Sequence, residues 1–156
     1  MLKEPWKQSK IITWSQLLLD NYRNLLGYEL IERKGNSEEQ AKALFFSPFA
    51  VASHGTEADP IYNYGNQVIL DLWERNWDEF VQTPSRLSAE PILQEERQKI
   101  LDKTTTQGYL KNYQCVRISR NGQRYKIEDI TILNLQDDQG NYCGQAATFS
   151  NWSVLN

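Results

Sequence analysis

Apolar residues recur at helical spacing near the start of the chain and alternate with polar residues in its last third. A first helix places large side chains on one face, namely Trp14, Leu18, Tyr22 and Leu25. Gly27 supplies a stop for this helix, and a second helix over 38–46 ends before Pro48. The pattern therefore predicts two amphipathic helices followed by other elements.

Two short sequences predict the start of each helix. Thr13 is followed three positions later by Gln16, and Ser37 by Gln40. In a capping box, a hydroxyl and an amide at this spacing satisfy free backbone N–H groups at the first turn. We therefore expect Thr13 and Ser37 to be the N-caps.

The middle of the chain reads as two short strands and two short helices. Residues 49–53 and 61–64 are predicted strands, joined across the turn-forming sequence HGTEADP. Asn66 can cap a helix over 66–75, and 77–81 extends it as a second piece. A loop containing PSRLSAEP follows.

A long helix is marked at both ends, by Pro91 at its first position and by Gly108 after its last turn. Ile100 and Leu101 contribute to its apolar face. Arg97 lies on that same face, which predicts that a cation points toward the core.

The last third is predicted to be sheet. Residues 109–120 and 123–136 are β-rich and are joined by Asn121-Gly122, a sequence typical of a two-residue hairpin turn. This turn would pair Val116 with Ile127 on one face. A third strand follows over 142–149.

Four segments carry a resemblance to a known family. They read SHGTEADPIYNYGN, TPSRLSAEP, VRISRNGQRYKIED and GNYCGQAATF, in this order. They closely resemble the MEKHLA family, a module related to PAS sensory domains, over about residues 44–150. The resemblance implies an α+β PAS-like fold, with a five-stranded antiparallel sheet and helices on one face. We accordingly expect a helical extension over 1–43 and the PAS-like domain over 44–156.

Composition and net charge limit the partners and the location that we expect for this chain. The chain has 156 residues, 40% of them hydrophobic, and a formal net charge of −3. We expect a single soluble cytoplasmic domain that binds neither nucleic acid nor membrane, because its overall field repels anions and no segment approaches the roughly 20 apolar residues of a membrane span. We also expect no disulfide, because the PAS strand order separates Cys115 from Cys143 by two strand spacings, roughly 10 Å.

The expected hairpin register suggests a polar group in an otherwise apolar pocket. It places Asp129 on the helix-covered face, where a buried carboxylate needs a partner. Arg97 is the first choice for this partner and Arg86 the second. A β-bulge would instead return Asp129 to solvent, and this alternative is equally weighted. The candidate ligand-binding residues are Trp73, Trp77, Arg86, Arg97, Asn112, Gln114, Asp129, Thr131 and Gln145.

The sequence does not identify a cofactor. His54 is the only histidine, and we expect it to bond to backbone in a turn. The long helix has no histidine for haem, and PSRLSAEP lacks the cysteine that flavin photochemistry requires. Gln145 corresponds loosely to a flavin-contacting glutamine, although a structural role is the more economical interpretation. Trp73 and Trp77 most economically wall the core, and stacking on a planar ligand is the alternative.

The opposite face of the sheet is expected to carry Tyr113, Ile130 and Ile132. The first helix would cover them, either in its own chain or in a homodimer.

Three classes of function remain open at this stage. The resemblance favours a sensory module that binds a small apolar or planar ligand and signals to a separate protein, without enzymatic activity. The second class is a small isomerase-like or dehydratase-like enzyme that uses Asp129 as its base. The third is a structural interaction domain with a filled core.

Overall fold

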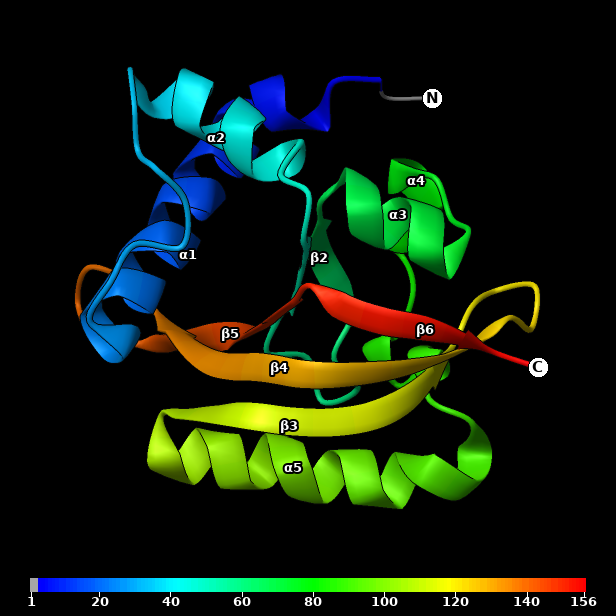
Figure 1. The fold of residues 1–156 in the computed structure, drawn as a ribbon. Coiled ribbons are helices and arrows are strands. Elements are labelled where there is room, and N and C mark those ends of the chain that lie inside the picture. Colours follow the sequence, from blue (N-terminus) through cyan, green and yellow to red (C-terminus); the bar gives the residue numbers. More distant parts are fainter. Residues whose placement is uncertain (1–2) are drawn as a thin grey trace.

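One antiparallel sheet runs through the molecule, and helices pack on both sides of it (Figure 1). The structure is a computed structural model and describes residues 3–156. The helices are α1 (Ser9–Leu26), α2 (Ser37–Phe45), α3 (Gln67–Trp73), α4 (Trp77–Phe80) and α5 (Gln94–Gln107). Three short 3-10 helices are η1 (Pro5–Lys7), η2 (Ser85–Ser88) and η3 (Pro91–Leu93).

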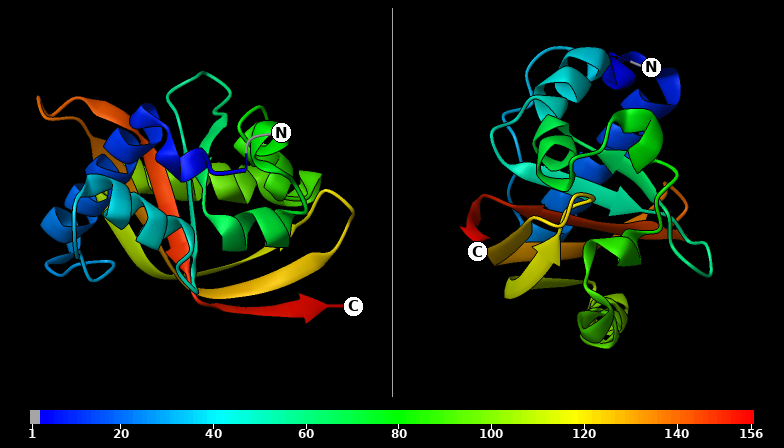
Figure 2. Two further views of the ribbon diagram at one scale, coloured as in Figure 1. Left: turned by 90° about the horizontal axis from the view of Figure 1, so that it is seen from above. Right: turned by 90° about the vertical axis from the view of Figure 1, so that its right-hand side faces the viewer.

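The sheet has six strands. They are β1 (Ala50–His54), β2 (Tyr62–Gly65), β3 (Tyr109–Ile118), β4 (Arg124–Gln136), β5 (Tyr142–Phe149) and β6 (Asn151–Leu155). Their order is β2-β1-β5-β4-β3, and β6 pairs with the first half of β4, beyond the end of β5 (Figures 1 and 2). The five-stranded PAS-like sheet is confirmed, and β6 is an addition that the sequence pattern did not predict. Because β4 separates β5 from β3, Cys143 and Cys115 lie two strands apart, and both are free thiols.

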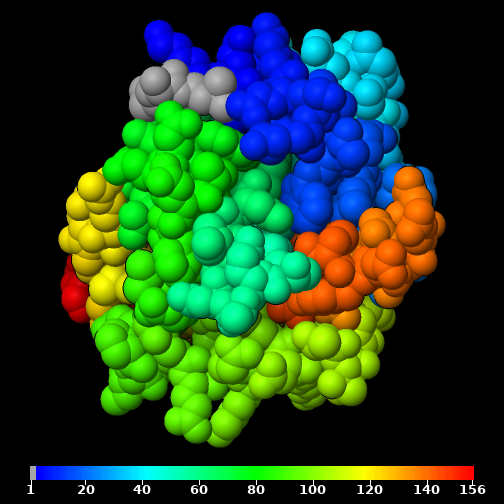
Figure 3. All heavy atoms as spheres, turned by 180° about the vertical axis from the view of Figure 1, so that it is seen from behind, coloured from blue at the N-terminus to red at the C-terminus, as the bar shows by residue number. Residues whose placement is uncertain are grey.

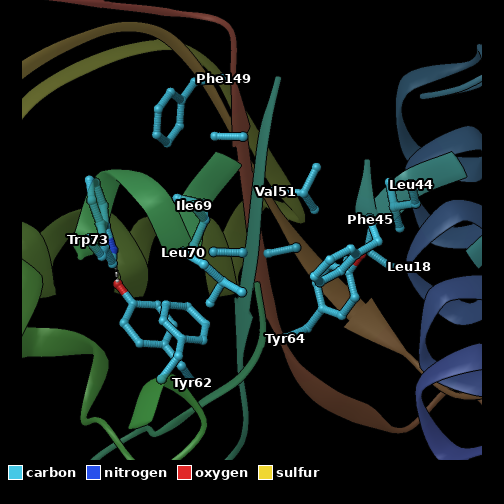
Figure 4. Packing of buried hydrophobic residues seen from close by; sticks show 14 of the residues in the cluster. Leu18, Leu44, Phe45, Val51, Tyr62, Tyr64, Ile69, Leu70, Trp73 and Phe149 are labelled. Atoms are coloured by element: carbon cyan, nitrogen blue, oxygen red, sulfur yellow. Dashed lines mark hydrogen bonds between the residues drawn. The ribbon is translucent and has the colours of Figure 1, made fainter. Parts of the chain in front are cut away.

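The buried core has two halves, one on each side of β1 (Figure 4). Val51 points toward Leu18 of α1 and Leu44 of α2, whereas Ile69 and Trp73 of α3 lie on the other side. Strand β2 contains a bulge at Asn63, where its register against β1 shifts. Tyr62 and Tyr64 consequently point to opposite sides, although alternation would place them on the same one.

Some of the residues predicted to begin or end helices are confirmed in this role, and two N-caps were assigned to the wrong residues. Asn66 caps α3 as expected, and Gly27, with φ of 86°, ends α1. The two capping boxes proposed at Thr13 and Ser37 are wrong. Thr13 lies inside α1, which begins one turn earlier at Ser9, and α2 uses Asn36 and Glu39, one residue before the proposed pair.

Asn66 also joins three elements from a fully buried position. Its Oδ1 accepts hydrogen bonds from the backbone N–H groups of Val51 in β1 and Ile69 in α3, at 3.0 and 3.3 Å. Its Nδ2 donates to Oγ of Ser47 and to the carbonyl of Phe49, in the loop after α2, at 3.0 and 2.7 Å. A single amide therefore fixes where β1 and α3 begin.

The hairpin between β3 and β4 adopts a register one residue away from the expected one. The Ser119 N–H donates to the Gln123 carbonyl at 2.8 Å, which closes a three-residue loop ending in Gly122 with φ of 90°. Cys115 therefore pairs with Ile127, and Val116 with Lys126. The predicted pairing of Val116 with Ile127 is therefore wrong. Because a slip of one residue exchanges the two faces of a strand, Cys115 and not Val116 shares a face with Ile127.

Two bulges then alter the faces again farther from the turn. Asp129 and Asn112 have φ of 54° and 59°, and the register shifts beside each of them. Asp129 is exposed, so the structure has the alternative in which a β-bulge returns this carboxylate to solvent, and the alternative in which it is buried is wrong. We expected Tyr113, Ile130 and Ile132 under the first helix, but they lie on the opposite face, toward α3 and α5.

The first helix still packs against β4 in its own chain. By alternation from Ile130 and Ile132, the β4 residues on this face are Thr131, Leu133 and Leu135, all of them buried. Leu18 and Leu19 of α1 are completely or almost completely buried as well. The N-terminal helix is therefore a structural part of the core.

We expect Leu18→Ala to lower the free energy of unfolding by about 2–5 kcal/mol, because it removes buried methyl groups and leaves a cavity. Thr13→Ala on the exposed side of the same helix is the control and should change stability by no more than about 0.5 kcal/mol. Urea unfolding would measure both. Equal stability of the two variants would show that α1 is not docked.

Asp129 provides a test of the bulge. Because its φ is positive, Asp129→Val should cost about 1–2 kcal/mol, whereas Asp129→Gly should stay within about 1 kcal/mol of the original. Because the carboxylate is exposed, its removal should combine additively with Arg97→Met in a double-mutant cycle. A coupling energy above about 1 kcal/mol would instead place Asp129 beside Arg97.

Candidate ligand-binding cavity

A cavity of about 90 Å³ lies between the sheet and helices α3 and α5. Most of its wall is apolar and is formed by Ile69, Trp73, Ile127, Ile130, Ile132 and Phe149. These side chains come from α3, β4 and β5, and they meet because the bulged register of β4 turns three isoleucines toward the helices. The cavity is large enough for several waters or one small molecule.

The polar wall comes from segments that are distant in sequence. Figure 3 shows the turn after β1, in teal, meeting the green segment that contains η2, above α5 in yellow-green. Three polar side chains reach the cavity from here, namely His54 at the end of β1, Ser85 in η2 and Arg97 in α5. Nη2 of Arg97 donates to Oγ of Ser85 at 2.5 Å, and Oγ lies 2.9 Å from Nδ1 of His54. Since arginine can only donate, the Ser85 hydroxyl proton remains available for the imidazole.

The His54 imidazole is neutral in the fold. Burial lowers its pKa from 6.5 to about 4, and the positive charge of Arg97 acts in the same direction. A hydrogen bond with Gln145 opposes these effects. His54 is only 5% exposed, and its bond to a side chain corrects our expectation of a turn residue bonded to backbone.

Arg97 is the most unusual residue of the cavity. The residue is 7% exposed, and the bond to Ser85 is the one hydrogen bond that its guanidinium makes within residues 3–156. No carboxylate in this part of the chain lies within ion-pair distance of it. Burial lowers the pKa of Arg97, although a guanidinium remains protonated at neutral pH. A cation with most of its donors unused therefore faces the cavity.

A second cation lies nearby on β3. Arg117 also lines the cavity and donates from Nη1 to the Val116 carbonyl at 2.8 Å. Burial raises the pKa of Tyr113, and the charge of Arg117 opposes this effect. Burial likewise raises the pKa of the Cys115 thiol, so this cysteine is protonated at neutral pH. The polar side of the cavity thus carries positive charge and neutral groups.

Gln145 connects the cavity to α5. Its Nε2 donates to the Leu101 carbonyl and to Oγ1 of Thr105, both at 3.0 Å, and to Oδ1 of Asn134. α5 itself buries only Arg97 and Thr104. The helix is therefore held to the sheet by few buried side chains, and Gln145 supplies several of the polar contacts between them.

The cavity contains three of the nine residues proposed from sequence, Trp73, Arg97 and Gln145. Arg86 instead forms an exposed ion pair with Asp59, and Trp77 packs on Tyr64 and Phe45. The remaining four do not line the cavity, because Asn112, Gln114 and Asp129 are exposed and Thr131 points toward the face of α1.

Several polar residues of the cavity were not predicted from sequence, among them His54, Ser85, Tyr113 and Arg117. His54 and Ser85 lie within SHGTEADPIYNYGN and TPSRLSAEP, so two of the family-like segments did contain them. Tyr113 and Arg117 were assigned to the wrong face because the two-residue turn was expected.

The fold is that of a PAS domain. A PAS domain of a protein from Colwellia psychrerythraea superposes with a TM-score of 0.63 and 13% identity, covering 76% of this chain and 95% of that one. A light-oxygen-voltage domain studied with a flavin analogue gives a TM-score of 0.59 at 16% identity, with 76% and 85% covered. The light-state dimer of the fungal blue-light photoreceptor Vivid gives 0.57 at 14%, with 83% and 88% covered.

Within this class, the chain belongs to the MEKHLA domain family, whose model matches residues 12–154. The match begins inside α1, in agreement with the role of this helix in the core. No curated protein matches the chain.

Two further observations concern residues 3–156. This part of the chain contains no group of histidine, cysteine, aspartate and glutamate side chains arranged to hold a metal ion. None of its helices is long and apolar enough to cross a bilayer.

His54 predicts a pH dependence of stability. The unfolded chain binds a proton near pH 6.5, and the folded one near pH 4, so the free energy of unfolding falls as the pH falls through this window. Between about pH 7.5 and about pH 5 this effect amounts to about 2 kcal/mol. Urea unfolding at both pH values would measure it. His54→Gln should lose that increment, and an unchanged pH dependence in this variant would mean that His54 is solvated.

Proposed function

We propose that this chain is a sensory module that binds a small molecule in the cavity and signals to a separate protein, without enzymatic activity. The observation that carries the proposal is an apolar cavity into which a few polar groups converge, among them the unsatisfied Arg97. Small-molecule sites combine an apolar wall with a few orienting polar groups in this way. The family match and the PAS-type neighbours support a sensory role.

The size of the cavity argues for a small ligand. About 90 Å³ is less than the 300–1,000 Å³ typical of pockets for drug-sized molecules, so the site does not accommodate a flavin or haem as it stands. The light-oxygen-voltage domain among the structural neighbours was studied with a flavin analogue. For this chain a flavin photocycle is further disfavoured, because η2 and its flanks, PSRLSAEP, contain no cysteine.

The two other classes of function have less support. The enzyme hypothesis used Asp129 as a base in the pocket, and this carboxylate is exposed. The filled interaction domain is disfavoured by the cavity itself. A homodimer through the apolar face of α1 is also disfavoured, because Leu18, Leu19 and Tyr22 are buried within their own chain. The two free thiols favour the cytoplasm as its location.

Native mass spectrometry of gently purified protein tests whether the cavity is occupied. We expect a retained small molecule, which Ala147→Leu should displace, because Ala147 lies on the cavity wall and leucine fills part of its volume. Ala43→Leu makes the same change on an exposed position of α2 and should keep the molecule.

A molecule retained equally by both variants would place the binding site elsewhere. Protein that holds nothing, and whose melting temperature responds to no compound in a small-molecule screen, would favour the interaction domain.

A further inference from the structure

We propose that the ligand of this cavity is a short aliphatic carboxylate, whose charged end pairs with Arg97 and whose apolar end contacts the isoleucine wall. The inference rests on the proposed function and adds the chemical class of the ligand. It derives from the charges, the free hydrogen-bond donors and the volume of the site.

The buried guanidinium of Arg97 is the first argument. Burial of a charge is unfavourable unless the group is paired and hydrogen-bonded, and its fork of N–H donors matches a carboxylate in bidentate geometry. Within residues 3–156, this guanidinium has one hydrogen bond, to a neutral hydroxyl, and no ion pair. A carboxylate in the cavity would supply both the missing charge and the missing acceptors.

The surrounding charges give the second argument. Arg117 adds a second cation to the cavity wall, and His54 is neutral. Two carboxylates act on these groups, Asp59 on Arg97 and Glu57 on His54, but both are exposed, and Asp59 forms its ion pair with Arg86. Glu96, on the helix that carries Arg97, is exposed too. The site thus favours an anion over a neutral or cationic molecule.

The apolar wall and the volume restrict the rest of the ligand. Ile127, Ile130 and Ile132 form an apolar surface that an aliphatic part of the ligand can contact. A cavity of 150 Å³ can hold benzene, and this one is smaller, at about 90 Å³. A carboxylate with a short branched or straight aliphatic chain fits these limits better than a long-chain or an aromatic acid.

The only histidine of the chain provides a probe inside the cavity. His54 shares Ser85 with Arg97, so a bound anion that neutralises Arg97 should change the His54 imidazole signals and raise its pKa. NMR titrations would compare butyrate and isovalerate with their primary amides, which have nearly the same shape but no charge. We expect saturable shifts with the acids and at least about tenfold weaker binding of the amides. Octanoate and inorganic phosphate test the limits on length and on the apolar part.

Variants then assign the effect to Arg97. Arg97→Met should weaken binding of the acid about tenfold or more and remove the preference for acid over amide. Arg97→Lys keeps the charge and should retain part of that preference. Arg124→Met removes an exposed arginine paired with Glu90 and should bind both compounds as the unmodified protein does.

The outcomes separate this inference from the proposed function. Equal binding of acid and amide, or an acid preference that survives Arg97→Met, would overturn the carboxylate assignment while the cavity remains a ligand site. If the Met variant does not fold, the acid and amide titrations of the unmodified protein still decide the question. Saturable binding of phosphate but not butyrate would replace the carboxylate by an inorganic anion. A cavity that responds to no compound, in a protein that also retains nothing in native mass spectrometry, would remove the proposed function itself.

Discussion

The register between β3 and β4 determines which side chains face the cavity. It results from a three-residue turn that ends at Gly122 and from two bulges at Asn112 and Asp129, each with a positive φ. If any one of these features were absent, alternate residues would exchange faces over part of the hairpin. The isoleucine wall, the position of Arg117 and the exposure of Asp129 all follow from these three local conformations.

Much of the fold could be predicted because its signals are local. Asn66, Gly27 and Gly108 mark element ends through their own backbone preferences, and each of them lies at an observed boundary. Pro91, which was expected to begin the long helix, instead begins the 3-10 helix η3, and α5 starts three residues later at Gln94. The register could not be predicted in the same way. Asn-Gly is compatible with both a two-residue and a three-residue turn, and the alternatives differ by one residue. Bulges are harder still, since an aspartate at a positive φ has no distinctive neighbours in sequence.

The candidate site was only partly predictable for a related reason. Arg97 was identified correctly as a cation on the apolar face of the long helix, but its assigned partner was wrong because that assignment depended on the register. Its actual partner, Ser85, is twelve residues away in a 3-10 helix, and His54 is a further 31 residues away. A contact between such segments depends on the tertiary structure, and it cannot be predicted from helical or strand periodicity.

Few side chains of α5 are buried, and this helix is therefore the element through which ligand binding could be transmitted to another protein. A helix that buries two of its fourteen residues has a low free energy of detachment from the sheet, so it belongs to the part of the molecule that opens first. One of those two residues is Arg97, and the helix is further held by partly buried Ile100 and by hydrogen bonds from Gln145 and Asn134. A molecule in the cavity would add contacts between α5 and the sheet. Its concentration would therefore set the fraction of time that α5 is docked.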